Sequence, residues 1–416
     1  MLDPEEYLAS LEPVGWSFGL ERMRALCAEL GEPQRRFESL HVVGTNGKSS
    51  VTTMCAALLS GTGKRTGACI SPHAWRWSER TRIDGEEIGA AAFAGAVAEV
   101  AAAIDVVERD AGGERVTQFE AAIAASFVAF ARAEVDVAVV EAGLGGRLDA
   151  TNVIPSRATA LTSVALDHTE LLGETEAEIA VEKLAVLQPG SALVIGDLPD
   201  AVERLARARA AELGAAVIEP APLDPALLPA GIAPYLGRNA AVAVALAAVV
   251  AGPLADEVVA AALAETALPG RAERIPGEPP LLADAAHNEQ GAKALAEALP
   301  AFAAGRPVFA CLSVLADKDA EAITAALAPV LAGAVCTAVD PGPAMGRPGS
   351  RARDPHELAA LLTAAGVSAE VIAGPEAAVA RVLERAEAEG GVAICAGSHY
   401  LLRYAWTVKR ARSSYR

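Results

Sequence analysis

One stretch, residues 41–51 (HVVGTNGKSSV), restricts what this chain can fold into more than any other. The apolar run before it predicts a short buried strand over 37–43, and the apolar face after it predicts a helix over 51–59. A glycine-bearing turn between a strand and a helix places backbone N–H groups and the positive end of the helix around an anion. The stretch therefore predicts a phosphate-binding loop.

The spacing in this loop is shorter than the usual G-x-x-x-x-G-K-[ST], because Val42 stands where the first glycine would be. In the motif that remains, Lys48 would neutralise the outer phosphates, and Ser49 or Ser50 would reach a magnesium ion. A bare Gly-x-x-Gly-Lys is equally compatible with an ordinary strand-to-helix turn that carries a solvated lysine. The strand and the helix around the motif favour phosphate binding.

Strands and helices alternate through the first two hundred residues. Further strands are expected at 68–71, 135–141, 158–167 and 192–196, and helices at 88–107, 119–133 and 176–187. This alternation predicts an α/β fold with a doubly wound, mainly parallel sheet, in which ligands bind beyond the carboxyl ends of the strands. Ser71, Glu141 and His168 fall at such ends, so we expect them near the phosphate loop. Taken singly, each residue could instead have a purely structural role: Ser71 could cap a helix, Glu141 could be an acidic residue of a loop, and the His168 ring could pack against its neighbours.

A run rich in proline and glycine, 268–280 (LPGRAERIPGEPP), marks a domain boundary. The alternation starts again beyond it, with strands expected at 281–287, 306–315, 333–340, 368–374 and 391–397. We therefore expect a larger domain over residues 1–274 and a second, smaller α/β domain over residues 275–416. Within the first domain, residues 75–88 mix bulky, charged and glycine residues and are expected to form a long functional loop.

Charge and cysteine usage limit the partners and the compartment. The net charge of −18 argues against nucleic acid or an anionic membrane as a partner, so an anionic ligand would need cations concentrated around it. The six cysteines are scattered without a C-x-x-C pair, as expected of buried thiols in a reducing cytosol. The acidic N-terminus does not read as a signal peptide, and the longest apolar run is too short to cross a bilayer. We expect a cytoplasmic protein.

Motifs along the whole chain resemble the folylpolyglutamate synthase/dihydrofolate synthase family, a branch of the Mur ligase superfamily. The most family-specific is EAGLGGRLDATN at 141–152. Others include HVVGTNGKSS (41–50), SPH (71–73), ERTRIDG (79–85), LDH (166–168), PGRAE (269–273), DAAHN (284–288), DKD (317–319) and AGSHYLL (396–402). The resemblance implies a P-loop domain of the Mur-ligase central type, followed by a Rossmann-like Mur ligase C-terminal domain.

The activity that the resemblance implies is ATP-driven addition of L-glutamate to a carboxylate through an acyl phosphate. The substrates would be dihydropteroate, reduced folates or both, and the enzyme would be a cytoplasmic monomer without nucleic-acid or membrane partners. The cofactors would be ATP, Mg²⁺ at two sites and, as an option, a monovalent cation. Because Thr117 and Asp149 match family positions for the pterin-bearing substrate, we expect a bifunctional enzyme.

Roles for individual residues follow from the resemblance alone. The nucleotide site would be formed by Gly44, Thr45, Asn46, Gly47, Lys48, Ser49, Ser50, Asn239, Arg271 and Asp284. The metal ligands would be Ser49, Ser71, Glu141, His168 and Lys183. The folate site would include Arg80, Thr117 and Asp149, and the catalytic groups would be Lys48, His168, Lys183, Asp284 and His287.

Lys183 resembles a lysine that the family carbamylates, a reaction that requires a neutral amine and hence a shielded site that lowers the lysine pKa. From the residues alone it could equally be a surface lysine beside a helix acid. The chain also departs from the family pattern at three places. Ser49 follows the loop lysine where glycine is common, Glu289 replaces a proline, and Tyr235-Leu236 replace a His-Gln pair.

Two other functions account for parts of the sequence. A Mur-type ligase acting on a UDP-muramoyl peptide would need an N-terminal UDP-binding domain of about a hundred residues, and only 40 residues precede the loop. A non-catalytic nucleotide switch would need the loop but neither the DAAHN motif nor Lys183. The folate-glutamate ligase is therefore the expected function.

Overall fold

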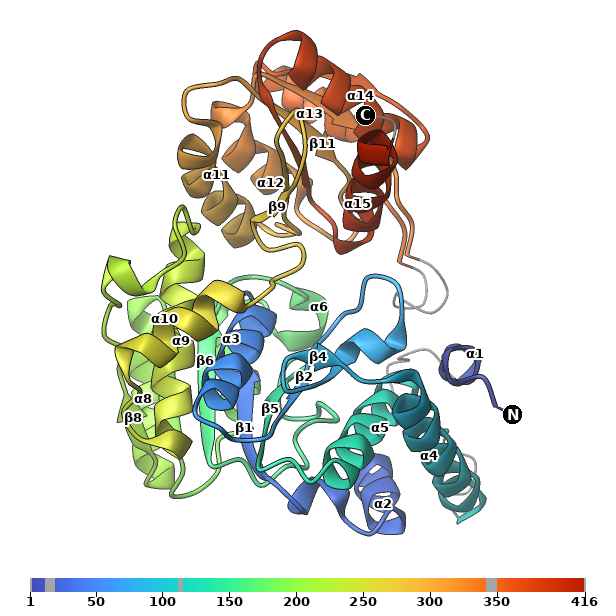
Figure 1. Ribbon diagram of the computed structural model, residues 1–416, viewed down its shortest axis with the longest axis vertical. Helices are drawn as coiled ribbons and strands as arrows, with labels where there is room; N and C mark the ends of the chain where they lie inside the picture. The colour runs from blue at the N-terminus through green and yellow to red at the C-terminus, as the bar shows by residue number, and fades with distance from the viewer. Residues whose placement is uncertain (1, 12–18, 111–114, 342–349, 415–416) are drawn as a thin grey trace. The chain divides into compact units, whose positions relative to one another are not determined.

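The computed structural model describes residues 2–11, 19–110, 115–341 and 350–414. The chain forms two compact units, each with its own sheet (Figure 1). The first unit holds the described residues up to Pro229 together with Gly237–Thr266, and the second holds Ala230–Leu236 and the described residues from Ala267 onward. The division into domains at 274–275 stays a prediction.

The sheet of the first unit has the strand order β4-β3-β2-β5-β1-β6-β7-β8. Its parallel part consists of β1 (Glu38–Val43), β2 (Thr66–Cys69), β5 (Val137–Glu141), β6 (Ala158–Ser163), β7 (Ala192–Asp197) and β8 (Ala216–Ile218). An antiparallel edge is added by β3 (Thr81–Ile83) and β4 (Glu86–Glu87). Every position of β5 is buried, which is typical of a parallel strand covered by helices on both faces.

Helices connect and cover these strands. They are α1 (Pro4–Ser10), α2 (Glu21–Glu29), α3 (Lys48–Gly61), α4 (Ala90–Asp110), α5 (Gln118–Arg132), α6 (Thr169–Leu172), α7 (Glu176–Leu184), α8 (Asp200–Leu213), α9 (Pro234–Ala251) and α10 (Asp256–Glu265). One apolar cluster joins α2, α4 and α5 to β5 through residues such as Phe127 and Val140. Another joins α7 and α8 to β6 and β7 through residues such as Leu161 and Ile179.

The second unit has a six-stranded sheet in the order β13-β12-β11-β14-β10-β9, in which β9 is antiparallel and the other described strands are parallel. Its strands are β9 (Glu273–Ile275), β10 (Leu281–Ala283), β11 (Val308–Leu312), β12 (Gly333–Cys336), β13 (Ser368–Val371) and β14 (Val392–Ala396). Its helices are α11 (Glu289–Ala303), α12 (Ala320–Leu327), α13 (Pro355–Ala364), α14 (Pro375–Ala388) and α15 (His399–Ser414). The predicted α/β class and mainly parallel sheet are confirmed.

The segment 75–88 is not the long loop that the sequence predicts. A 3₁₀ turn at Trp77–Arg80 leads into the β3–β4 hairpin, whose tight turn contains Asp84 and Gly85, both at positive φ. Because β3 has only three residues, its sequence is too short to show the alternation of apolar and polar side chains that predicts a strand. The hairpin extends the sheet, so the segment is fixed by backbone pairing.

Among the described residues, two helices, α4 and α9, are long and apolar enough to cross a membrane by length and composition. Burial along α4 instead follows a helical period, with Phe93, Val97, Val100 and Ile104 inside the first core. The opposite face carries Glu99, Asp105 and Arg109. This one-sided burial is typical of a core helix in a water-soluble protein.

Candidate active site

The loop between β1 and α3 has the geometry of a phosphate cradle. Gly47 adopts a φ of 86° immediately before α3 begins at Lys48, a conformation that glycine reaches without strain. A Cβ atom at Gly44 would lie 2.0 Å from Thr162 Oγ1, and one at Gly47 would lie 2.8 Å from Asn239 Oδ1. A side chain at either position would therefore clash with a neighbouring residue, in addition to straining the turn. The contact at Gly47 also shows that Asn239 lies against the loop.

Hydroxyl groups at the end of β6 hold this loop in place. Thr162 Oγ1 donates to the Asn46 carbonyl at 2.6 Å, and Ser163 Oγ accepts from the Asn46 N–H at 2.9 Å. The Thr45 hydroxyl donates to the Ala165 carbonyl at 3.2 Å. Sequence reasoning did not identify Thr162 and Ser163, although two consecutive hydroxyl residues at the carboxyl end of a buried strand were a usable signal.

Glu141 is the last residue of β5, and its carboxylate is hydrogen-bonded to α3 and to the segment after β2. Its residue lies beside Val42 in the β1–β5 register, and its carboxylate is almost completely buried. Ser49 Oγ donates to Glu141 Oε1 at 2.9 Å, and the Ser71 N–H donates to Glu141 Oε2 at 2.9 Å. The structure thus brings together Ser49, Ser71 and Glu141, three of the residues predicted to hold metal. A carboxylate and serine oxygens suit Mg²⁺, which prefers hard oxygen ligands.

Lys183 reaches the same loop from α7. Its Nζ is buried and donates to the Gly44 carbonyl at 2.9 Å, while Lys48 Nζ donates to the same carbonyl at 3.0 Å and to the Thr45 carbonyl at 3.1 Å. Burial, followed by the nearby Lys48 charge, lowers the pKa of Lys183 to about 7. Asp167 and Asp149 act in the opposite sense without cancelling this effect. Lys183 is therefore an amine that is partly neutral near pH 7.

His168 begins the short helix α6, on the loop that follows β6. Its backbone is left-handed, with φ of 53°, and its Nε2 lies 3.7 Å from Asp167 Oδ1. The same loop contacts the phosphate loop through the Ala165–Thr45 hydrogen bonds. The structure places His168 on a segment joined to the phosphate loop, and its role as a ligand stays a prediction.

Ser50 is fully buried on α3, and its hydroxyl has no hydrogen-bond partner among the described residues.

The three residues expected to bind folate already have internal partners. Thr117 caps α5, exchanging hydrogen bonds with Glu120. The Asp149 carboxylate accepts from the Leu144 and Thr151 N–H groups, and burial raises its pKa. Arg80 donates from Nε to His73 Nδ1 at 2.9 Å and lies over the Trp77 ring. These contacts explain the conformation of each residue, and substrate contact stays a prediction for all three.

The remaining candidates lie in the second unit, near the carboxyl end of β10. Asp284 follows β10, and its buried carboxylate accepts from the N–H groups of Ala272 and Ala286. Arg271 Nη2 lies 3.3 Å from His399 Nε2, and the rings of His287 and His399 are 5.7 Å apart. Arg271, Asp284 and His287 are thus neighbours within this unit. Tyr235, which also hydrogen-bonds to Asp284, stands out in the sequence only as a departure from the family pattern.

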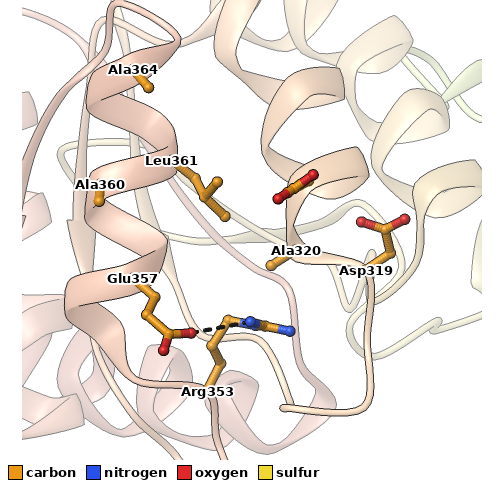
Figure 2. A pocket seen from close by; sticks show the side chains of 8 residues that line it. Asp319, Ala320, Arg353, Glu357, Ala360, Leu361 and Ala364 are labelled. Carbon is orange, nitrogen blue, oxygen red and sulfur yellow. Dashed lines mark hydrogen bonds and ion pairs between the residues drawn. The ribbon is translucent and has the colours of Figure 1, made fainter.

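A hollow of about 590 Å³ elsewhere in the second unit has a different character (Figure 2). It lies between the start of α12 and α13, and Arg353, just before α13, pairs at 3.1 Å with Glu357 on that helix. Asp319 and Glu321 add two more carboxylates to the lining. Three acids against one guanidinium do not suit a polyphosphate, and none of the predicted site residues line this hollow.

Comparison with known proteins decides the family. The profile of the Mur ligase, glutamate ligase domain matches residues 270–399. The chain is 36% identical over 359 residues to the dihydrofolate synthase/folylpolyglutamate synthase of Mycobacterium tuberculosis, covering 76% of this chain and 74% of that protein. This chain belongs to the folylpolyglutamate synthase/dihydrofolate synthase family.

Solved structures of folylpolyglutamate synthase/dihydrofolate synthase family members share the fold over nearly the whole length. A Mycobacterium tuberculosis folylpolyglutamate synthase, crystallised with ADP and AMPPCP, is 31% identical with a TM-score of 0.87 and 97% coverage of both chains. A bifunctional enzyme from Yersinia pestis, complexed with AMPPNP and a manganese ion, is 28% identical with a TM-score of 0.81, covering 98% of this chain and 96% of that one. The resemblance in the sequence motifs, the fold class and the assignment as a ligase are therefore confirmed.

Proposed function

We propose that this enzyme joins L-glutamate to dihydropteroate and to reduced folates that already carry glutamate, at the expense of ATP. The observation that carries the proposal is the convergence of Ser49 and Ser71 on the Glu141 carboxylate, beside a glycine loop that presents Lys48. Such a site can hold a nucleoside triphosphate and a divalent metal ion. Membership of the folylpolyglutamate synthase/dihydrofolate synthase family supports the choice of carboxylate and amine substrates.

The reaction has two steps. A folate or pteroate carboxylate oxygen attacks the γ-phosphorus, ADP leaves, and an acyl phosphate forms. The glutamate amine then attacks the acyl carbon, inorganic phosphate leaves, and the amine proton passes to solvent. Phosphoryl transfer depends mainly on positioning and charge neutralisation. The glycine loop would orient the phosphates through its N–H groups, and Lys48 would neutralise charge on the transferred group.

Glu141, Ser49 and Ser71 would hold Mg²⁺, which supplies charge neutralisation on the β- and γ-phosphates. A second ion near His168 and a monovalent cation belong to the same proposal. We also propose that Lys183 is carbamylated. Its lowered pKa makes a neutral amine available for CO₂ near pH 7, and the resulting carbamate would add an anionic oxygen ligand beside the loop.

The setting that we propose is a cytoplasmic monomer without nucleic-acid or membrane partners. All six cysteines are free and buried, which suits a reducing compartment. Arg271, Asp284 and His287 would serve nucleotide or glutamate from the second unit, and Arg80, Thr117 and Asp149 would serve the pterin-bearing substrate.

Mass analysis of reaction products tests this function. The enzyme is incubated with ATP, Mg²⁺ and glutamate, together with either dihydropteroate or a reduced folate. We expect a mass gain of one glutamate on both acceptors, and Glu141→Gln should abolish both products. A gain on one acceptor alone would restrict the enzyme to one activity. Nucleotide binding without an amide product on either acceptor would contradict the proposal.

A further inference from the structure

The buried Asp284 carboxylate in the second unit receives hydrogen bonds from three separate segments. Ala272 N–H donates to Oδ2 at 2.7 Å, and Ala286 N–H donates to Oδ1 at 3.0 Å. The third donor is the hydroxyl of Tyr235, which bonds to Oδ2. With these donors in place, both oxygens of the carboxylate are engaged by the protein itself.

The two residues whose backbone N–H groups donate to Asp284 have unusual backbone conformations. Ala272 has φ of 43° and Ala286 has φ of 33°, a left-handed conformation that costs free energy for any residue with a Cβ. Such a conformation persists where its surroundings fix it, and a hydrogen bond from each N–H to one buried carboxylate provides that constraint. Asp284 therefore holds two strained positions at once.

Each strained alanine adjoins a residue expected to act on substrate. Ala272 directly follows Arg271, and Ala286 directly precedes His287. The direction in which a side chain leaves the backbone depends on the φ and ψ angles around it. The Asp284 carboxylate thus sets the backbone on which Arg271 and His287 stand, so its contribution can be indirect.

Tyr235 completes this arrangement from the first turn of α9. Burial and the Asp284 carboxylate raise the Tyr235 pKa well above its usual value, so the hydroxyl stays protonated and acts as the donor. Removing this hydroxyl would leave Oδ2 with the Ala272 N–H and take away its side-chain donor. A buried carboxylate that loses a donor is more costly to keep ionised and is less firmly oriented.

We propose that Tyr235 is a positioning residue of this ligase, which acts by fixing the Asp284 carboxylate and through it the backbone at Arg271 and His287. The inference rests on the proposed function and deepens it. It assigns a role to a residue at which the chain departs from the pattern of the family.

A double-mutant cycle tests whether Tyr235 acts through Asp284. Tyr235→Phe removes only the hydroxyl and should lower kcat/KM for ATP about tenfold, the effect of one lost hydrogen bond to a charged group. In an Asp284→Asn background, which already lacks the charged acceptor, the same change should cost less than about twofold. Tyr404→Phe removes a tyrosine hydroxyl that contacts Arg403 in the same unit, and it should leave kcat/KM unchanged.

Amide hydrogen exchange gives a readout that does not depend on turnover. Tyr235→Phe should speed exchange in peptides that contain Ala272 and Ala286, and Tyr404→Phe should not. Wild-type kcat/KM in Tyr235→Phe, or equal losses in the two backgrounds, would overturn the inference. Failure of the wild-type enzyme to form product would refute the proposed function instead, and unchanged exchange at both peptides would then still overturn the role of Tyr235.

Discussion

At the scale of single residues, Glu141 and Lys183 show how burial turns ordinary side chains into parts of a site. The Glu141 carboxylate is buried, yet it accepts from a helix residue and from the segment after β2. Lys183 is buried and its amine shares the Gly44 carbonyl with Lys48, and burial first and the Lys48 charge second disfavour its charged form. Neither environment is visible in the sequence around the residue, because the neighbours come from loops and a helix far away in the chain.

The Lys183 pKa predicts a dependence on both pH and bicarbonate. Its value in the folded protein, about 7, lies below the ordinary 10.5, so the neutral fraction rises from about a tenth at pH 6 to about nine tenths at pH 8. In CO₂-depleted buffer, added bicarbonate should increase turnover, with little gain at pH 6 and most of the gain by pH 8. Initial rates of ADP formation measure this effect.

The matched variants are Lys183→Met, which cannot be carbamylated, and Lys293→Met, which removes an exposed lysine paired with Glu289. Lys183→Met should lose the response to bicarbonate together with most of its turnover, and Lys293→Met should keep both. A wild-type rate that is insensitive to bicarbonate across this pH range would rule out a functional carbamate.

At the scale of elements, the start of α5 separates a structural role from a binding role. The Thr117 hydroxyl accepts from the Glu120 N–H and donates to the Glu120 carboxylate, which also pairs with the buried Arg22. This reciprocal capping satisfies donors that the helix end leaves open. The conformation of residues 117–120 (TQFE) is thus explained locally, before any substrate is considered.

Thr117→Ala should therefore destabilise the enzyme by about 1 kcal/mol, the usual cost of a lost N-cap. Thr117→Ser keeps the hydroxyl, and its free energy of unfolding should lie within about 0.5 kcal/mol of the wild-type value. Urea unfolding followed by circular dichroism measures both variants, and the KM for the folate substrate is measured alongside. A raised KM in both variants with unchanged stability would show that Thr117 serves the substrate and not the helix.

Elements differ in how well a sequence predicts them, for physical reasons. The strand–loop–helix at Lys48 was predictable because its glycines, its lysine and its apolar flanks are all local. From Ala240 onward the α9 helix is an almost uniform run of alanine and valine, which has no contrast between faces and so gives no helical period. The link from Tyr235 to Asp284 spans 49 positions, and no local pattern announces it. Local chemistry was readable, and tertiary pairing was not.

At the scale of the whole molecule, each unit has at least one apolar core of its own among the described residues. Residues such as Phe127 and Leu161 belong to cores of the first unit, and Leu295 and Leu312 belong to the core of the second. A chain with separate cores need not unfold in one step, so a single melting temperature can hide two transitions. A ligand should stabilise most the unit that supplies its contacts.

Calorimetry with AMPPNP and Mg²⁺ tests this expectation. At a hundred times its Kd, the nucleotide should stabilise the protein by about 2.7 kcal/mol, which moves the transition of the first unit upward by several degrees. Removing Mg²⁺ with EDTA, or introducing Glu141→Gln, should shrink the shift. Glu38→Gln, at an exposed ion pair with Arg157, should leave it intact. An equal shift in all samples would remove Glu141 from the nucleotide–metal site.

The hydroxyls of Thr162 and Ser163 fix the path of the phosphate loop in the folded protein. A cradle that is already shaped has little conformational entropy left to lose when nucleotide arrives. The association rate constant should then be similar for different nucleotides and approach the diffusion limit, and differences in affinity should appear in the dissociation rate constant. The residues that set residence time would be those at the mouth of the cradle, and the β6 hydroxyls would govern whether it exists at all.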